Sequence, residues 1–271
     1  MRAALPALIT LTFGAGVGAA VRDTHHATPG HPSAQRAAHT SHSSSPQDTL
    51  EQYAREHAFA FLDQPSKSGA VDRWDPCVTI HYNVHIAAGV PRSTDAVEAI
   101  EAAFNQVAVA SGMHFDDDGP TTEAPSDSRK DVRHTRSGWT WAPVLVAVVP
   151  HSAFVRDIDS DDAVAFADPD IYTSDDDTLS EIVSGQIVVD ADRISDQGPS
   201  DPNGLEPTLL HEIGHLVGLG HVKVSGEIMQ PDGGGIVGLG PGDLAGLQYL
   251  GAAAGCIVDP AVPRDSEDFP Q

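Results

Sequence analysis

An alternation of apolar and polar residues over 78–86 is the clearest pattern in the first half of the chain. Its apolar positions are Val78, Ile80, Tyr82, Val84 and Ile86. A period of two predicts a β-strand with one face on a core and one polar face. His81 and His85 belong to the polar face, so we expect neither to take part in a metal site.

A helical spacing of apolar residues follows this strand. Pro91 breaks the strand, and Ser93 is placed to cap a helix. The apolar positions of that helix are Val97, Ile100, Phe104 and Val107. Short apolar runs over 141–149, 163–167 and 186–189 are separated by Asp, Pro, Ser and Gly and predict further strands. We therefore expect an α/β fold in which a sheet is followed by late helices.

Two more helices are predicted in the last third of the chain. Asn203 followed by Glu206 resembles a capping box, and Pro207 falls in the first turn, where its missing N–H is tolerated. This helix runs through LLHEIGHLVGL and should end near Gly218, because glycine readily takes the left-handed conformation found after helix ends. A last helix is predicted over 243–250.

Three histidines in this region have the spacing of metal ligands. On a helix, His211 and His215 project from one face, one turn apart, so both rings can reach one ion. After the turn at Gly218, His221 can supply a third ligand and leave the fourth position of a tetrahedral zinc to water, which is typical of catalysis. Purely structural histidines are the alternative, but chance would give H-E-x-x-H-x-x-G-x-x-H roughly once in ten thousand sequences of this composition.

Glu212 lies beside the expected zinc without being one of its ligands. Bound zinc lowers the pKa of water from about 15.7 towards 7 and polarises a carbonyl. Glu212 can then accept the proton of the attacking water and pass it to the leaving amine. The pattern predicts amide hydrolysis with Glu212 as the general base.

The stretch HEIGHLVGLGH over 211–221 resembles the signature of the metzincin metallopeptidases. Met229, in EIMQP, resembles the methionine-containing turn below the zinc in that clan, and Pro231 after it is similar to matrixins. Astacins and serralysins carry a tyrosine ligand there, and we expect none here. GDLAGLQYLG is similar to the start of the matrixin C-terminal helix, and RWDPCVTIHYNV resembles the first strand of bacterial matrixin-like proteins.

The resemblance implies an α+β fold of the zincin type, with a twisted, mostly parallel five-stranded sheet, an active-site helix, a Met turn and a C-terminal helix. It also implies a cleft between an edge strand and the Met turn, where a peptide substrate adds to the edge by strand pairing. The run 163–167, with Ala163 and Ala165, is our candidate edge strand. Pro231 begins the glycine-rich segment 231–240, which would form the opposite wall.

The chain departs from the matrixin pattern in three places. Val164 and Val188 stand where matrixins carry histidines for a structural zinc, so we expect one catalytic zinc only. Asp190 stands at a position that resembles a calcium ligand of the family, so a Ca²⁺ ion bound there is an alternative that the sequence leaves open. No cysteine stands upstream of the domain to block the zinc as a latency switch.

The charge of the chain excludes several kinds of partner. With 39 acidic and 15 basic residues the formal charge is −24, which would repel nucleic acid and anionic lipid surfaces. Asp is concentrated at 116–118, 157–162 and 175–177, in segments predicted to be loops. These segments are either a solvated surface or ligands for calcium.

The ends of the chain lack the pattern of a core. Residues 1–20 have an early Arg2, an apolar run and small residues before a cleavage point, which predicts a signal peptide and an extracellular protein, with no membrane association after cleavage. Residues 21–48 are rich in His, Ser and Pro and are predicted to be a disordered arm: a linker, a short pro-segment or a metal-gathering tract. We expect one catalytic domain over 49–257, an acidic tail over 258–271, and a monomer.

The two cysteines, Cys77 and Cys256, are expected to form a disulfide after export, with buried free thiols as the alternative.

Three functions are compatible with these features. The first is a secreted zinc endopeptidase acting on proteins or peptides. The second is a zinc hydrolase of a non-peptide amide, which would need a closed pocket. The third is a non-catalytic secreted binding protein with a vestigial site, against which the intact Glu212 and three histidines argue.

Overall fold

The computed structural model describes residues 45–90, 93–153, 163–195, 201–231 and 235–263. The predicted signal peptide, almost all of the predicted arm, and residues 264–271 of the predicted tail lie outside these ranges. All described residues belong to one compact unit. None of the helices in the described ranges is long and apolar enough to cross a bilayer.

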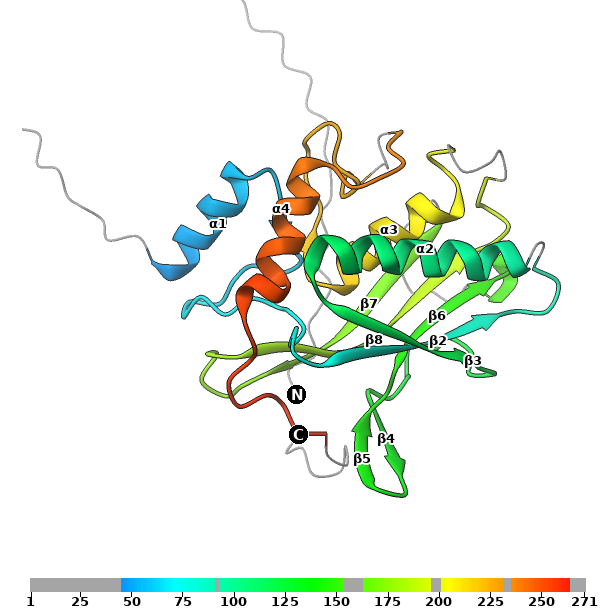
Figure 1. Cartoon of the computed structure of the whole chain (residues 1–271), viewed down its shortest axis with the longest axis horizontal. Coiled ribbons are helices and arrows are strands. Elements are labelled where there is room, and N and C mark those ends of the chain that lie inside the picture. Colours follow the sequence, from blue (N-terminus) through cyan, green and yellow to red (C-terminus); the bar gives the residue numbers. More distant parts are fainter. Residues whose placement is uncertain (1–44, 91–92, 154–162, 196–200, 232–234, 264–271) are drawn as a thin grey trace, which may run out of the picture. The chain divides into compact units, whose positions relative to one another are not determined.

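The central feature is a five-stranded sheet of order β3-β2-β6-β8-β7 (Figure 1). Its strands are β2 (Thr79–Ile86), β3 (His114–Pro120), β6 (Val144–Val149), β7 (Ala165–Thr173) and β8 (Ser180–Asp190). All neighbours pair in parallel except β7, which is antiparallel to β8 and forms an edge. The predicted, mostly parallel five-stranded fold is confirmed.

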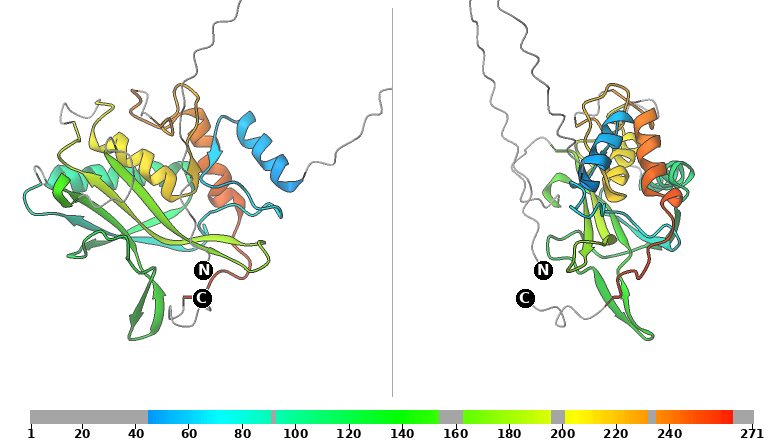
Figure 2. Two further views of the ribbon diagram at one scale, coloured as in Figure 1. Left: turned by 180° about the vertical axis from the view of Figure 1, so that it is seen from behind. Right: turned by 90° about the vertical axis from the view of Figure 1, so that its left-hand side faces the viewer.

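Four helices accompany the sheet: α1 (Pro46–Glu56), α2 (Ser93–Ser111), α3 (Leu205–Leu216) and α4 (Pro241–Leu250). Helices α2 and α3 lie on one face of the sheet, and a hairpin of β4 (Val132–Thr135) and β5 (Gly138–Trp141) projects from the other (Figures 1 and 2). Tyr82 of β2 stacks on Phe104 of α2, with ring centroids 4.2 Å apart. The main core therefore lies between the sheet and these helices.

The central strands are buried along their whole length. Every residue of β6 and β8 is buried, as expected for parallel strands covered on both faces. Strand β2 instead keeps its predicted alternation, with Ile80, Tyr82 and Val84 buried. A second, smaller apolar cluster on the other face includes Leu145 and Val188.

Several boundaries differ from the sequence prediction. Trp141 ends the β4–β5 hairpin, and Pro143, which has no N–H to donate, separates it from β6. The acidic run 116–118, predicted to be a loop, belongs to the edge strand β3, where its carboxylates face solvent. Ser93 is the first residue of α2 rather than its cap, and Gly204, not Asn203, caps α3.

Order begins earlier than predicted. Helix α1 starts at Pro46, inside the segment assigned to the arm. The Ser45 hydroxyl oxygen accepts a hydrogen bond from the backbone N–H of Asp48. The Asp48 carboxylate accepts one from the backbone N–H of Ser45. This capping box, with Pro46 at the first helical position, is the local signal that fixes the start.

The structure ties the start of β2 to the end of the domain by a disulfide. Cys77 and Cys256 are bonded across a sequence separation of 179 residues, which confirms the predicted pair. Two short strands, β1 (Ala60–Phe61) and β9 (Leu219–Gly220), pair antiparallel beside α4. Two 3₁₀ turns, η1 (His151–Ala153) and η2 (Ala252–Ala254), complete the described elements.

Candidate active site

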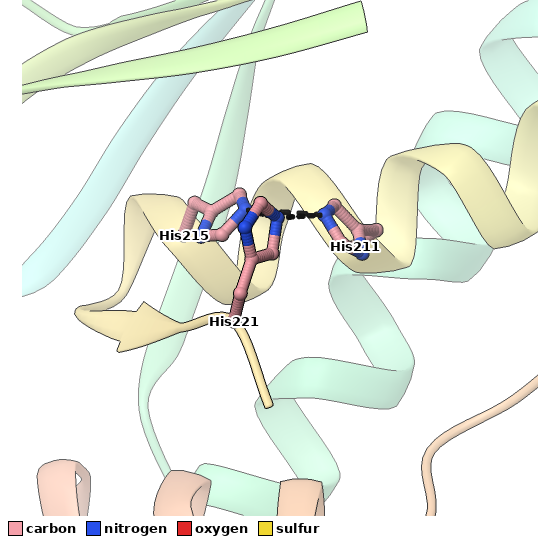
Figure 3. A group of neighbouring side chains, drawn as sticks. All are labelled: His211, His215 and His221. Carbon is pink, nitrogen blue, oxygen red and sulfur yellow. Dashed lines mark hydrogen bonds between the residues drawn. The ribbon is translucent and has the colours of Figure 1, made fainter. Parts of the chain in front are cut away.

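The three predicted ligands come together at the end of α3. His211 and His215 lie one turn apart on the helix. The chain then turns at Gly218, whose φ of +102° is readily adopted only by glycine, and strand β9 delivers His221. The Nε2 atoms of the three rings are 3.1 Å from one another in every pair (Figure 3).

Backbone carbonyls orient two of these rings. His211 Nδ1 lies 2.7 Å from the carbonyl oxygen of Ile228, and His215 Nδ1 lies 2.8 Å from that of Leu219. Because a carbonyl oxygen only accepts, each Nδ1 must carry the proton, and each Nε2 then presents a lone pair. Second-neighbour bonds of this kind fix the tautomer of metal-binding histidines.

The converging nitrogens fit a zinc ion. Two bare Nε2 atoms cannot hydrogen-bond to each other, so the short contact between His211 and His215 calls for a cation. Nitrogens bound to one tetrahedral zinc at about 2.0–2.1 Å lie about 3.3 Å apart, close to the spacing seen here. His211, His215 and His221 could therefore hold zinc.

The surrounding protein keeps these rings neutral. Displacement of water, together with the smaller effect of the neighbouring histidine rings, lowers the pKa of His215 to about 3. The pKa of His221 is lowered to about 4 by the same two causes, although part of its ring stays exposed, and burial also lowers that of His211. At neutral pH all three are in the form that binds metal.

A cavity of about 810 Å³ contains these rings and Glu212. Glu212 itself is only 6% exposed. The cavity brings together the other predicted cleft residues, because Ala165 at the start of the edge strand, Ala163 two residues before it and Pro231 after the Met turn all line it. Sequence reasoning missed several further lining residues, among them Leu62 and Arg193.

Met229 forms a floor behind the ligands. It is 2% exposed, and a Cβ atom at Gly214 would collide with its sulfur, so only glycine lets the Met turn lie against α3. Val222 N donates to Met229 O over 3.0 Å, which joins the turn to the segment after His221.

A buried carboxyl group holds the Met turn in place. Asp243, near the start of α4, accepts from the backbone N–H groups of Ile228 at 2.6 Å, Gly240 at 2.7 Å and Met229 at 3.3 Å. Burial, with a smaller contribution from the neighbouring Glu227, raises the pKa of Asp243 to about 6. Sequence reasoning missed Asp243, although its position three residues after Gly240 is a helix-start signal.

Asp190 contacts nitrogen atoms of His151 and Arg193. Its carboxylate is fully buried, lies 2.6 Å from His151 Nδ1 and 3.5 Å from Arg193 Nε, and accepts from the backbone of Asp192. A calcium ion requires six to eight oxygen ligands. The structure therefore gives no support to calcium at Asp190.

A second set of potential ligands lies on β2 and β3. His81, Asp116 and Asp118 are all exposed and close enough to reach one ion. His81 Nδ1 already contacts Asp118 at 2.8 Å, and Arg133 lies 4.0 Å from the same carboxylate. His85 is not in this set, and its Nδ1 lies 3.3 Å from Thr121 O. We assign no metal there.

Comparison with known proteins agrees with this geometry. Residues 144–250 match the family model of the matrixins, peptidase family M10, and this stretch runs from β6 to α4 and includes all three histidines. No curated protein sequence matches the chain. Matrixins are zinc-dependent metallopeptidases, and the match over residues 144–250, together with the histidine cluster, supports a matrixin-like metallopeptidase of the metzincin clan.

Proposed function

We propose that the protein is a secreted endopeptidase that hydrolyses peptide bonds with a zinc-activated water and with Glu212 as the general base. The observation that carries the proposal is the convergence of three Nε2 atoms in the cavity that also contains the Glu212 carboxyl group. Zinc in that position would polarise the substrate carbonyl and lower the pKa of water.

The side chains supply the rest of the chemistry. Glu212 takes the proton of the attacking water and returns it to the leaving amine, and its low exposure limits competition from bulk solvent. His211 and His215 are held by the Ile228 and Leu219 carbonyls, so they need no reorganisation to act as ligands.

The shape of the cavity favours an extended peptide over a small amide. Ala165 and Ala167 of the edge strand β7 line it, and an edge strand offers backbone groups to which a peptide can pair. A hydrolase of non-peptide amides would be expected to enclose its substrate. A binding protein that had lost its activity would not be expected to keep Glu212 in the same cavity as the three histidines, so this arrangement favours an active enzyme.

Secretion is supported by the pattern of residues 1–20 and by the disulfide between Cys77 and Cys256, since such bonds persist in oxidising compartments. The net charge of −24 argues against binding to nucleic acid or an anionic membrane. We propose protein or peptide substrates and a monomeric enzyme with one zinc.

The test is hydrolysis of casein by the protein, with and without a zinc chelator, and after zinc is added back. We expect chelation to abolish cleavage and zinc to restore it. Glu212→Gln should keep the metal and the fold but lose about 100-fold or more in rate, because an amide cannot accept the proton of water. Glu206→Gln is the matched control, since Glu206 lies on the same helix, bonds to Gln106 and does not line the cavity. Full activity in Glu212→Gln would contradict the mechanism.

A further inference from the structure

The segment before the predicted first strand of the domain reaches the active site. Strand β1 pairs with β9, with Ala60 opposite Gly220 and Phe61 opposite Leu219. Leu62 N donates to Gly218 O over 2.8 Å and extends this pairing by one residue. The next residue after β9 is His221, so the segment lies directly beside the third histidine of the cluster.

Glycines allow this segment to pack closely. A Cβ atom at Gly220 would meet Phe61 O, and one at Gly242 of α4 would meet Ala58 O. A Cβ atom at Gly246 would come within 3.0 Å of the ring of Phe59. The chain before Leu62 is therefore fitted to the backbones of β9 and α4, as an integral part of the catalytic domain.

Aromatic contacts anchor the same segment. Phe59, Phe61 and Tyr249 form a cluster with ring centroids 5.4 to 6.0 Å apart, and Tyr53 of α1 joins it at 5.4 Å from Tyr249. Phe59 is 3% exposed. These contacts fix the position of the next residue, Leu62.

The pleat of the strand directs Leu62 away from this cluster. Phe61 and the opposite Leu219 pack against the main core. Successive side chains along an extended chain point to opposite faces, so Leu62, which continues the pairing of β1 at Gly218, faces the other way. Leu62 lines the cavity that contains His221 and Glu212.

We propose that Leu62 is a specificity-determining residue that selects an apolar substrate side chain in the cavity that it shares with His221. This inference rests on the proposed peptidase function. An apolar side chain bound against Leu62 removes apolar surface from water, whereas a carboxylate there would be desolvated without a partner. One contact of this size discriminates between substrates by roughly 10-fold or more.

The experiment uses fluorescent peptides derived from one casein cleavage site. At each of three positions on either side of the cut, the residue is Leu, Ala or Asp in turn. The measured quantity is the ratio of kcat/KM for the Leu peptide to that for the Ala peptide. This ratio does not change with the fraction of folded enzyme, so it separates a contact with substrate from a loss of structure.

We expect wild type to prefer Leu at one position and Leu62→Ala to lower that preference by roughly 10-fold, with the other positions unchanged. Leu62→Asn, of similar size, should lower it as well. Leu244→Ala is the control, because Leu244 is an exposed leucine of α4 that does not line the cavity. Unchanged ratios at every position in both Leu62 variants would overturn the proposal. Failure of wild type to cleave any peptide or casein would instead overturn the peptidase function and this inference with it.

Discussion

Apart from a set that includes the two disulfide-bonded cysteines, two groups of side chains among the described residues are close enough to bind a metal ion, and they differ in how their atoms are arranged. In the first, the Nδ1–H groups of His211 and His215 donate hydrogen bonds to backbone carbonyls. Their Nε2 atoms therefore present lone pairs, which converge with Nε2 of His221. In the second, His81 lies 49% exposed and contacts Asp118 within the group itself.

The difference shows that proximity alone does not make a metal site. In the β2–β3 group, Asp118 already contacts His81, Arg133 lies 4.0 Å from the same carboxylate, and all three members are exposed to solvent. In the histidine group, water is displaced and the bare nitrogens have no positive partner among themselves. The free energy of binding a cation is most favourable where the ligand lone pairs are already oriented and partly desolvated.

The largest expected effect comes from removing one histidine from each group. His215→Ala should lower casein hydrolysis by more than about 100-fold, because loss of a ligand exceeds the 10–100-fold typical of its supporting groups. His81→Ala should leave the rate within about 2-fold, since surface changes away from a site have small effects. Initial rates at equal concentrations of folded protein measure both. Equal losses in the two variants would remove the distinction between the groups.

A smaller effect is expected from pH in the metal-free protein. A His215 pKa of about 3 in the folded state lies below the ordinary value of 6.5 in the unfolded state. The unfolded chain therefore takes up the proton first as pH falls, so stability from this group is present above pH 6.5 and is lost progressively down to about pH 3.

Thermal unfolding of the metal-free protein between pH 7 and pH 4 would measure this effect. We expect the midpoint temperature to fall with pH more steeply in wild type than in His215→Ala, because each pKa unit corresponds to about 1.4 kcal/mol. His81→Ala should follow the wild-type curve. If the midpoint temperature changed with pH in the same way in wild type and in His215→Ala, this would contradict the inference that the His215 imidazole is desolvated in the folded protein.

The smallest effect concerns the floor beneath the histidine group. Gly214→Ala places a methyl group against the sulfur of Met229 and should lower the free energy of unfolding by about 1–3 kcal/mol, as overpacking does. Gly238→Ala is the control, since its Cβ would meet nothing within 4 Å. Denaturant unfolding of both variants gives the comparison. If the Gly214→Ala protein were as stable as the Gly238→Ala protein, the Met229 side chain would have to move aside at little cost.

The sequence predicted the elements whose periodicity is local. Alternation identified β2, and helical spacing with flanking glycines identified α2, α3 and α4 within a few residues. The H-E-x-x-H spacing placed His211 and His215 on one helical face because that geometry depends on the helix alone.

Features that depend on distant segments were missed. Leu62 enters the cavity only because β1 pairs with β9, more than 150 residues later, and neither strand is long enough to have a periodic pattern. Asp243 acts on Ile228 and Met229 through backbone N–H groups, which carry no side-chain signature. The contacts of Asp190 were missed for a similar reason, because His151 and Arg193 become its neighbours only in the folded chain.

The central claim is that His211, His215 and His221 hold the zinc, and the most direct measurement is the zinc content per chain after dialysis against a weak chelator. We predict one zinc in wild type and in His81→Ala, and none in His221→Ala. Zinc retained by His221→Ala, or lost from His81→Ala, would contradict the account.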